Sequence, residues 1–409
     1  MTAAPAPSTA AVGDTRVVAL LCLAEALSMT GFAAYPAFLP TLRAAWGLSG
    51  AEAGFVGGAF FFGYMLAVPL LSGVTDRIDA RSVFAFSCAL AVSGSVGFAL
   101  AAHGMRSAAL WQALTGAGLA GTYMPGLKAL TDRVGGPRQA RYVAFYTSTF
   151  GIGTSLSLLL AGWLGATLPW RTAFVVLALG PLLAVPAVLA GLRPQRPHGA
   201  HRAPWLPRFG AVLALREVRR YVFGYALHCW ELFGLRSWLV AFIVFAYAAG
   251  HAAAPALNAT EAAALINLFG LPASILGNEA AGRWGRRRWI AAAMAASGLL
   301  CWLEGFAATW PWWLMLATLT LYFVATMADS AALTAGLIAA TPLAQRGAAM
   351  AVYSLLGFGA GFVSPLAFGA VLDAAGDGTL AWGLAFGTLG SGGLAWTALS
   401  RRRQPAGKV

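Results

Sequence analysis

The sequence predicts an all-α polytopic membrane protein with twelve transmembrane helices, six on either side of a central polar segment. Three observations lead to this fold class: an apolar composition, twelve apolar runs, and basic residues that lie between the runs. Of the 409 residues, 59% are hydrophobic and 10% are charged, whereas a soluble globular protein has about 25% charged residues. The 49 glycines agree with this class, because small residues let membrane helices approach closely.

Each predicted span is an apolar run long enough for a helix to cross a bilayer, which takes about 20 residues. The runs cover residues 17–40, 51–72, 82–103, 107–130, 142–164, 171–192, 221–248, 260–281, 289–309, 312–339, 348–372 and 380–400. The longest polar interruption separates the first six runs from the last six. We therefore expect a disordered cytoplasmic N-terminus (1–16), a first half (17–192), a cytoplasmic linker (193–220), a second half (221–400) and a cytoplasmic tail (401–409).

The basic residues predict the orientation of the chain in the membrane. With a cytoplasmic N-terminus, 22 of the 27 lysines and arginines fall in cytoplasmic segments and only 3 in outer loops. This asymmetry follows the positive-inside rule and places both termini in the cytoplasm, with the protein in the plasma (inner) membrane. The net charge of +13 does not indicate a nucleic-acid partner, because the basic residues lie in short loops rather than on a separate domain.

Internal similarity between the two halves supports the division into six and six. Span five contains AFYTSTFGIG and span eleven contains AVYSLLGFGAG, each with a tyrosine (Tyr146 and Tyr353) followed by Gly-x-Gly. The loops SGVTDRIDARS after span two and GNEAAGRWGRRR after span eight are also counterparts, since each joins an acidic residue to arginines in a short cytoplasmic turn. Such repeats are common in secondary transporters.

These motifs resemble those of the major facilitator superfamily over the whole chain. Residues 73–81 look like the family's loop between helices two and three, residues 277–288 look like its second-half copy, and Trp170-Arg171-x-x-Phe174 resembles a motif at the start of helix six. Two positions depart from the family pattern: Asp79 stands where glycine is usual, and Gln112 stands where the family often has an arginine linked to proton coupling.

The resemblance implies two six-helix bundles around a central cavity lined by spans one, four, seven and ten. It also implies a cytoplasmic latch between the bundles, made by the loop residues Gly73, Asp76, Arg77, Arg81, Arg283 and Arg286. Independently of the resemblance, an ionisable side chain at membrane depth costs about 2.5–3.5 kcal/mol and normally faces a cavity or a partner. Charged and tyrosine side chains at such depth give the candidate substrate and proton pathway: Glu25, Tyr35, Lys128, His228, Glu231, Arg236, Tyr322 and Asp329.

Several of these residues have a second interpretation that the sequence leaves open. Lys128 lies near the cytoplasmic end of span four, where its ammonium could also reach the headgroups. Arg236 could form a buried ion pair with Glu25 or Asp329, and His228 could be a hydrogen-bonded packing residue. Glu231 and the other two acids are the candidates for carrying a proton.

The function expected from these features is secondary active transport of a small organic solute by alternating access, coupled to protons. Arg236 and Lys128 favour a solute with a carboxylate. Two alternatives remain: a transition-metal transporter using ligands such as His228 and Cys229, or a non-transporting membrane assembly factor or sensor. We expect no enzyme activity and no cofactor, because the sequence has no P-loop and no nucleophile–base–acid set. The expected partners are the solute, protons and the lipid bilayer, and we expect a monomer.

Overall fold

The structure is a computed structural model, and it describes residues 9–195, 209–250, 255–376 and 378–402. In these residues every regular element is a helix. The α-helices are α1 (Thr9–Ser28), α2 (Ala34–Trp46), α3 (Gly50–Val74), α4 (Ala80–Ala101), α5 (Met105–Arg133), α6 (Gln139–Thr167), α7 (Trp170–Leu177), α8 (Leu179–Gly191), α9 (Phe209–Ala214), α10 (Arg216–Ala249), α11 (Ala259–Trp284), α12 (Arg286–Glu304), α13 (Trp312–Met327), α14 (Ser330–Ala340), α15 (Arg346–Ala375) and α16 (Thr379–Arg402). Two short 3-10 helices, η1 (Ala307–Thr309) and η2 (Leu343–Gln345), lie in turns.

The helices form the twelve predicted spans. Nine spans are single helices, and three are divided into the pairs α1/α2, α7/α8 and α13/α14. Within the described residues, eight segments are long and apolar enough, by length and composition alone, to cross a membrane. The spans formed by α1/α2, α5, α12 and α16 complete the set.

Proline explains two of the three divided spans. Pro36 lies in the first turn of α2 and Pro181 in the first turn of α8, where a missing backbone N–H costs little because first-turn N–H groups have no intrahelical acceptor. The third division falls at Asp329, directly before α14. There the carbonyl of Ala328 accepts a hydrogen bond from the indole Nε1 of Trp289 at 2.8 Å.

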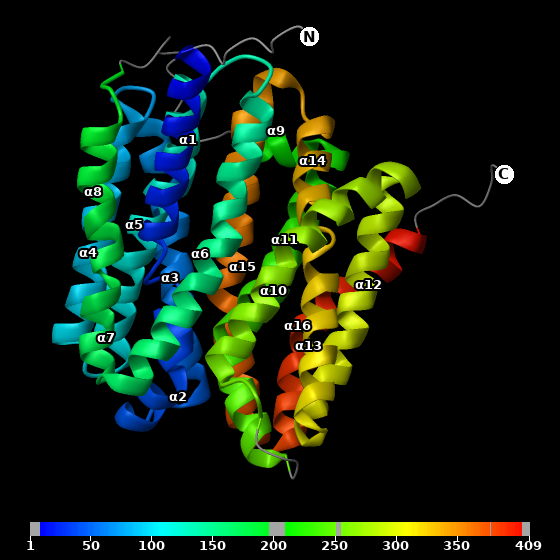
Figure 1. The fold of residues 1–409 in the computed structure, drawn as a ribbon. Coiled ribbons are helices and arrows are strands. Elements are labelled where there is room, and N and C mark those ends of the chain that lie inside the picture. The colour runs from blue at the N-terminus through cyan, green and yellow to red at the C-terminus, as the bar shows by residue number, and fades with distance from the viewer. Residues whose placement is uncertain (1–8, 196–208, 251–254, 377, 403–409) are drawn as a thin grey trace, which may run out of the picture.

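Spans one to six lie side by side in one bundle and spans seven to twelve in a second bundle (Figure 1). α1 begins and α16 ends on the same side of the molecule, which we call the terminal side; the opposite side is the far side (Figure 1). The bundles meet mainly where α3 packs on α15, α6 on α11, and α2 on α10.

The apolar core differs between the two sides. On the far side one continuous cluster joins both bundles, and it includes Phe61 of α3 and Phe233 of α10, whose ring centroids are 4.1 Å apart. On the terminal side there are two separate clusters, one around Phe84 in the first bundle and one around Tyr221 in the second. The bundles are therefore packed together on the far side, while their terminal-side cores are separate.

Two helix boundaries differ from the expected segments. α1 begins at Thr9, so residues 9–16 are helical rather than disordered; extending an existing helix adds one hydrogen bond per residue and needs no new nucleus. α10 begins at Arg216, inside the segment expected to be a linker, and the short helix α9 precedes it. The expected disorder of residues 1–8 and the tail beyond Arg402 lie outside the described residues.

Candidate functional site

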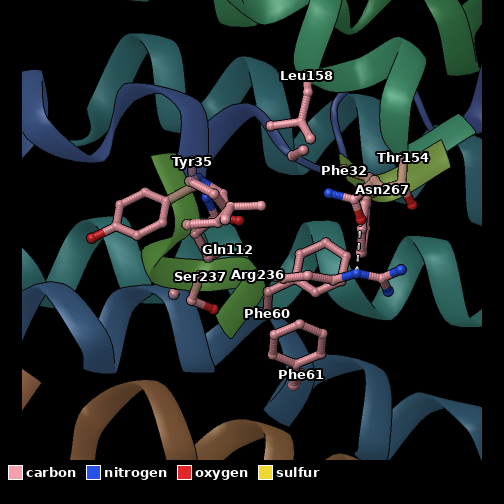
Figure 2. A pocket seen from close by; sticks show the side chains of 14 residues that line it. Phe32, Tyr35, Phe60, Phe61, Gln112, Thr154, Leu158, Arg236, Ser237 and Asn267 are labelled. Carbon is pink, nitrogen blue, oxygen red and sulfur yellow. Dashed lines mark hydrogen bonds between the residues drawn. The ribbon is translucent and has the colours of Figure 1, made fainter. Parts of the chain in front are cut away.

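A small cavity lies between the two bundles, at the division of span one (Figure 2). Its volume is about 30 Å³, which is enough for water but not for an organic solute. It is lined by α2, α3, α5 and α6 of the first bundle and by α10 and α11 of the second. The lining residues are Phe32, Ala33, Tyr35, Pro36, Gly57, Phe60, Phe61, Gln112, Thr154, Leu158, Arg236, Ser237, Leu239 and Asn267.

Arg236 of α10 supplies the positive charge of this cavity. Its Nε donates a hydrogen bond to Oδ1 of Asn267 in α11 at 3.1 Å, and its guanidinium carbon lies 5.7 Å from the centroid of the Phe323 ring. Asn267 is itself fixed, because its Nδ2 donates to the carbonyl of Ala263 at 2.9 Å. The cavity thus holds an arginine that is oriented by an amide and an aromatic ring.

The first bundle faces Arg236 with neutral side chains. Gln112 of α5 is 6% exposed and lines the cavity together with Thr154 of α6 (Figure 2). Tyr35 also lines it, and its hydroxyl donates to the carbonyl of Ala53 at 2.8 Å. Apart from Arg236, none of the fourteen lining residues carries a charge.

Glu25 lies outside this cavity, in a polar cluster of the first bundle. It is 0% exposed, and its Oε2 is 3.2 Å from the Tyr146 hydroxyl and 3.4 Å from the Ser28 hydroxyl, both of which can donate to it. Ser28 also lies 3.2 Å from Thr122 Oγ1, so the cluster joins α1, α5 and α6. The second carboxylate oxygen, Oε1, is buried and has no hydrogen-bond partner among the described residues.

The two candidate acids of the second half, Glu231 and Asp329, lie inside the second bundle. Nδ1 of His228 is 2.8 Å from Oδ1 of Asp329, and both side chains are buried. Glu231 accepts a hydrogen bond from the Ser297 hydroxyl at 3.0 Å, and its other oxygen is buried without a partner in the described part of the chain. Tyr322 is fully buried beside this group.

The eight residues predicted for the substrate and proton pathway do not lie together around this cavity. Only Tyr35 and Arg236 line it. On α10 the reason is helix geometry: position 236 is about 140° around the helix from position 231, so Arg236 faces the cavity between the bundles while Glu231 faces into the second bundle. In span one the division at residues 29–33 changes the helical phase between Glu25 and Tyr35, so the two residues do not share a face.

The structure shows which contacts the three basic candidates make in this conformation. Lys128 forms an ion pair with Asp132 one helical turn away, at 3.0 Å, at the terminal-side end of α5. Arg236 contacts Asn267 instead of either acid proposed for it. His228 contacts Asp329.

Of the predicted latch residues, Arg81 makes its printed contacts within the first bundle. Arg81 donates from Nη1 to the carbonyls of Leu189 and Leu192, at 3.1 and 2.7 Å, and its Nε is 3.2 Å from Asp79. In the described ranges, no ion pair of Arg81 joins the two bundles. The other latch residues lie at the terminal side, where Asp76, Arg77 and Arg283 are exposed and Gly73 and Arg286 are half-buried.

Asp79, the departure from the family loop, anchors the beginning of the linker to the first bundle. Its carboxylate accepts hydrogen bonds from Arg133 Nη2 at 2.8 Å, from the backbone N–H of Gln195 at 2.7 Å and from that of Arg81 at 3.0 Å. Partial burial acts to raise the pKa of Asp79, but the hydrogen bonds from Arg133 and the two backbone N–H groups outweigh it and hold the pKa below its usual value.

The division of span one is stabilised by side chains from neighbouring helices. Ser157 of α6 accepts a hydrogen bond from the backbone N–H of Ala33 at 2.9 Å and donates one to the carbonyl of Thr30 at 2.7 Å. The Thr30 hydroxyl donates to the carbonyl of Leu177 at 2.6 Å, where span six is divided. Backbone groups that lose their helical partners at the two divisions are thus hydrogen-bonded by the side chains of Ser157 and Thr30. Such groups must be paired within the protein at membrane depth.

On the far side, an aspartate of the second bundle caps a helix of the first. The Asp373 carboxylate at the end of α15 accepts hydrogen bonds from the backbone N–H groups of Gly50 and Ala51 at 2.5 and 2.8 Å. One turn further along α3, a Cβ at Gly54 would overlap the carbonyl oxygen of Pro365. The far-side contact therefore depends on close backbone approach and on one carboxylate.

Reasoning from charge missed Asn267 and Thr154 as cavity residues and did not assign Gln112 to the cavity. The sequence does carry a signal for these three residues, which is a neutral polar side chain within an apolar span. The prediction used only ionisable groups and tyrosines at membrane depth. Asn267 and Arg236 lie on different helices, so their contact could not be read from spacing.

Comparison with known proteins agrees with this architecture. The family model described as Major Facilitator Superfamily matches residues 21–271, which is more than half of the chain. No curated protein matches the chain.

Solved structures share the fold at low sequence identity. A bacterial homolog of the human lysosomal transporter Spinster, in an inward-facing and unoccupied conformation, has a TM-score of 0.71 and 16% identity, covering 96% of this chain and 95% of its own. The xylose transporter XylE from E. coli, in a partially occluded inward-open conformation, has a TM-score of 0.69 and 14% identity, covering 96% and 99%. A point mutant of the nucleoside transporter NupG has a TM-score of 0.73 and 15% identity, covering 96% and 99%. By its family match and its twelve-helix fold, this chain belongs to the major facilitator superfamily, a family of membrane transporters rather than enzymes.

Proposed function

We propose that this protein is a proton-coupled secondary transporter that moves a small organic solute across the plasma membrane by alternating access. The terminal side is the cytoplasmic side, because most of the described basic residues lie in the helix ends and loops of that side. The central cavity is the solute site, and Glu25 is the residue that couples solute movement to protons.

The asymmetry of the core supports alternating access. The bundles share one apolar cluster on the far side and have separate clusters on the terminal side. A transporter of this kind exposes its central site to one side at a time, by rocking one bundle against the other. The arrangement corresponds to a conformation closed on the outside, in which the central cavity has a volume of about 30 Å³.

The position of Glu25 is the observation that carries proton coupling. It is a fully buried acid whose Oε1 has no partner, and within the described residues no cation forms an ion pair with it. Such a group is costly to ionise at membrane depth, so its charge depends on whether water and a proton donor can reach it.

Glu25 also lies next to the part of span one that lines the cavity. Its backbone carbonyl accepts from the N–H of Met29 at 3.2 Å and from the Ser28 hydroxyl at 2.8 Å. The divided segment follows directly, and Phe32 and Ala33 of that segment line the cavity. A change in the hydrogen bonds of Glu25 is therefore close enough to move the cavity wall.

Proteoliposomes that contain a pH-sensitive dye test this function. A panel of organic acids, sugars and nucleosides is added, and we expect at least one solute to change the internal pH in the course of its own uptake. Glu25→Gln is expected to abolish uptake against a gradient while keeping exchange of solute down its gradient. Glu217→Gln, at a surface ion pair with Arg287, is the matched control.

The coupling proposal fails if uptake by every responding solute is independent of the pH gradient. It also fails for Glu25 specifically if Glu25→Gln still accumulates solute; in that case Glu231→Gln and Asp329→Asn identify whether an acid of the second bundle couples instead. If no solute moves at all and a stable protein partner copurifies, the non-transporting alternative is favoured.

A further inference from the structure

We propose that the central cavity binds an organic monoanion, whose carboxylate is held by the two Nη groups of Arg236 and whose apolar part packs against the aromatic wall formed by Phe32, Phe60 and Phe61. This inference rests on the proposed function only in naming the bound anion as the transported solute.

The protein does not neutralise the charge of Arg236. Within the parts of the chain that the structure describes, Arg236 forms no ion pair, and its contacts are the Asn267 amide and the Phe323 ring. None of the residues lining the cavity is acidic. A cation without a counter-charge at membrane depth costs free energy unless it faces a polar cavity or a ligand. A negatively charged ligand in the cavity would therefore be stabilised by Arg236.

Asn267 leaves the correct edge of the guanidinium available. Its Oδ1 accepts from Nε of Arg236, while its Nδ2 is held by the carbonyl of Ala263, so the amide orientation is defined. Only Nε is used, and the two Nη groups extend away from Asn267 (Figure 2). Two parallel N–H donors on a planar group match the two oxygens of a carboxylate.

The wall of the cavity opposite Arg236 carries a polar side chain, Gln112. Gln112 is more than nine-tenths buried, lines the cavity, and its side chain makes no hydrogen bond to any described residue. Its amide is therefore free to donate a hydrogen bond to a polar ligand in the cavity. Gln112 therefore gives an independent indication that a polar ligand completes this site.

The aromatic wall indicates the shape and polarity of the part of the ligand beyond its carboxylate. The ring centroids of Phe32 and Phe60 are 5.4 Å apart and nearly perpendicular, at 75°, and Phe61 packs on Phe60 at 5.4 Å. These rings suit a flat or branched apolar group rather than a hydroxyl-rich one. Because one arginine is the only cation of the lining, the ligand charge that it balances is one, which favours a monocarboxylate over a dianionic phosphate.

The experiment measures binding to the purified full-length protein in detergent, by thermal stabilisation and calorimetric titration. The probes are three monocarboxylates, each compared with its neutral amide: benzoate with benzamide, phenylacetate with phenylacetamide, and 3-methylbutanoate with 3-methylbutanamide. Each pair keeps shape and removes charge. We expect at least one carboxylate to bind about 10- to 100-fold more tightly than its amide, the range given by a charge-assisted hydrogen bond.

Two variants test the role of Arg236, with Arg287→Gln on the surface as control. Arg236→Gln is expected to remove the preference for carboxylate over amide. Asn267→Asp keeps the arginine and nearly the same side-chain volume, but places a carboxylate against the guanidinium. It is expected to remove the preference as well, and it provides the test even if Arg236→Gln does not fold.

The proposal is overturned if no probe pair shows a carboxylate preference, or if the preference survives in Asn267→Asp. Its failure differs from that of the proposed function. Proton-coupled flux of a neutral solute that persists in Arg236→Gln would refute the anion site and keep the function, whereas charge-selective binding without any flux would keep the site and refute the function.

Discussion

Replacing Asp373 by asparagine should shift the protein toward a conformation open on the far side. The carboxylate bridges the bundles by accepting two backbone N–H groups at the beginning of α3, at 2.5 and 2.8 Å. Arg43 lies 4.0 Å away and contributes weakly. Both N–H groups belong to the first turn of a helix, where a negative charge is also favoured by the helix dipole.

The size of the shift follows from what the asparagine loses. A hydrogen bond to a charged group contributes about 1.5–3 kcal/mol, but in the open state the same groups are hydrated and this site is partly exposed. We therefore take about 1 kcal/mol for each of the two bonds, or about 2 kcal/mol in total. Since 1.4 kcal/mol corresponds to a factor of ten, the ratio of far-side-open to far-side-closed protein should rise about 30-fold.

Spin-label distance measurements across the far side can detect this shift. One label replaces Leu100 at the end of α4 and the other Leu380 at the start of α16, since both side chains are exposed, at 74% and 60%. Glu52→Gln is the control, because Glu52 caps the same helix end through the backbone N–H of Ser49 without touching the second bundle. The reasoning is refuted if Asp373→Asn leaves the distance distribution unchanged, or changes it no more than the control does.

Three further substitutions test other parts of the structure. Gly54→Ala should also favour the far-side-open state, by about 1–3 kcal/mol of overpacking, since its Cβ would overlap a backbone carbonyl of α15; Gly282→Ala, in open space, should show no such shift in the same distance measurement. Ser157→Ala should lower the free energy of unfolding by about 2–4 kcal/mol, because it leaves a buried N–H and a buried C=O unpaired, and unfolding in mixed micelles would measure this. Asp79→Asn should lower the melting temperature at pH 7, where the wild-type carboxylate is ionised and bound by Arg133. Because the pKa of Asp79 is depressed in the folded protein, this stabilisation is present above the pKa of the unfolded chain and is lost as the pH falls through the folded pKa. The melting temperatures of the two proteins should therefore converge below about pH 4. Melting curves that differ equally at all pH values would contradict the last expectation.

The fold could be predicted from the sequence because membrane depth imposes simple rules. The spans follow from apolar length, and family membership could be recognised from the loop and glycine motifs. The three divided spans were not foreseen, because a proline in an apolar run is compatible with an intact helix when neighbours satisfy the freed backbone. The hydroxyl groups that do so here, of Ser157 and Thr30, lie on other helices or within the division itself.

The candidate site was predicted only in part, and for a physical reason. Depth in the bilayer identifies a charge as unusual but does not say which neighbour satisfies it. One oxygen of Glu25 accepts hydrogen bonds from Tyr146 and Ser28, and Asp329 lies 2.8 Å from His228; these contacts exist only once the helices are packed. Arg236 lines the cavity because it lies on a different face of α10 from Glu231.

The acids and the arginine therefore have different places in the mechanism that we propose. Glu25 precedes the division of span one, and Asp329 lies at the division of span ten, so both acids adjoin points where a span can bend. Arg236 lies between the bundles, away from both acids. A proton at Glu25 and a solute at Arg236 would then act on opposite ends of the same divided segment, the residues from Met29 to Ala33. Because binding at either end biases the geometry of that segment, each would change the free energy of binding at the other by the same amount, and coupling would need no contact between the proton and the solute.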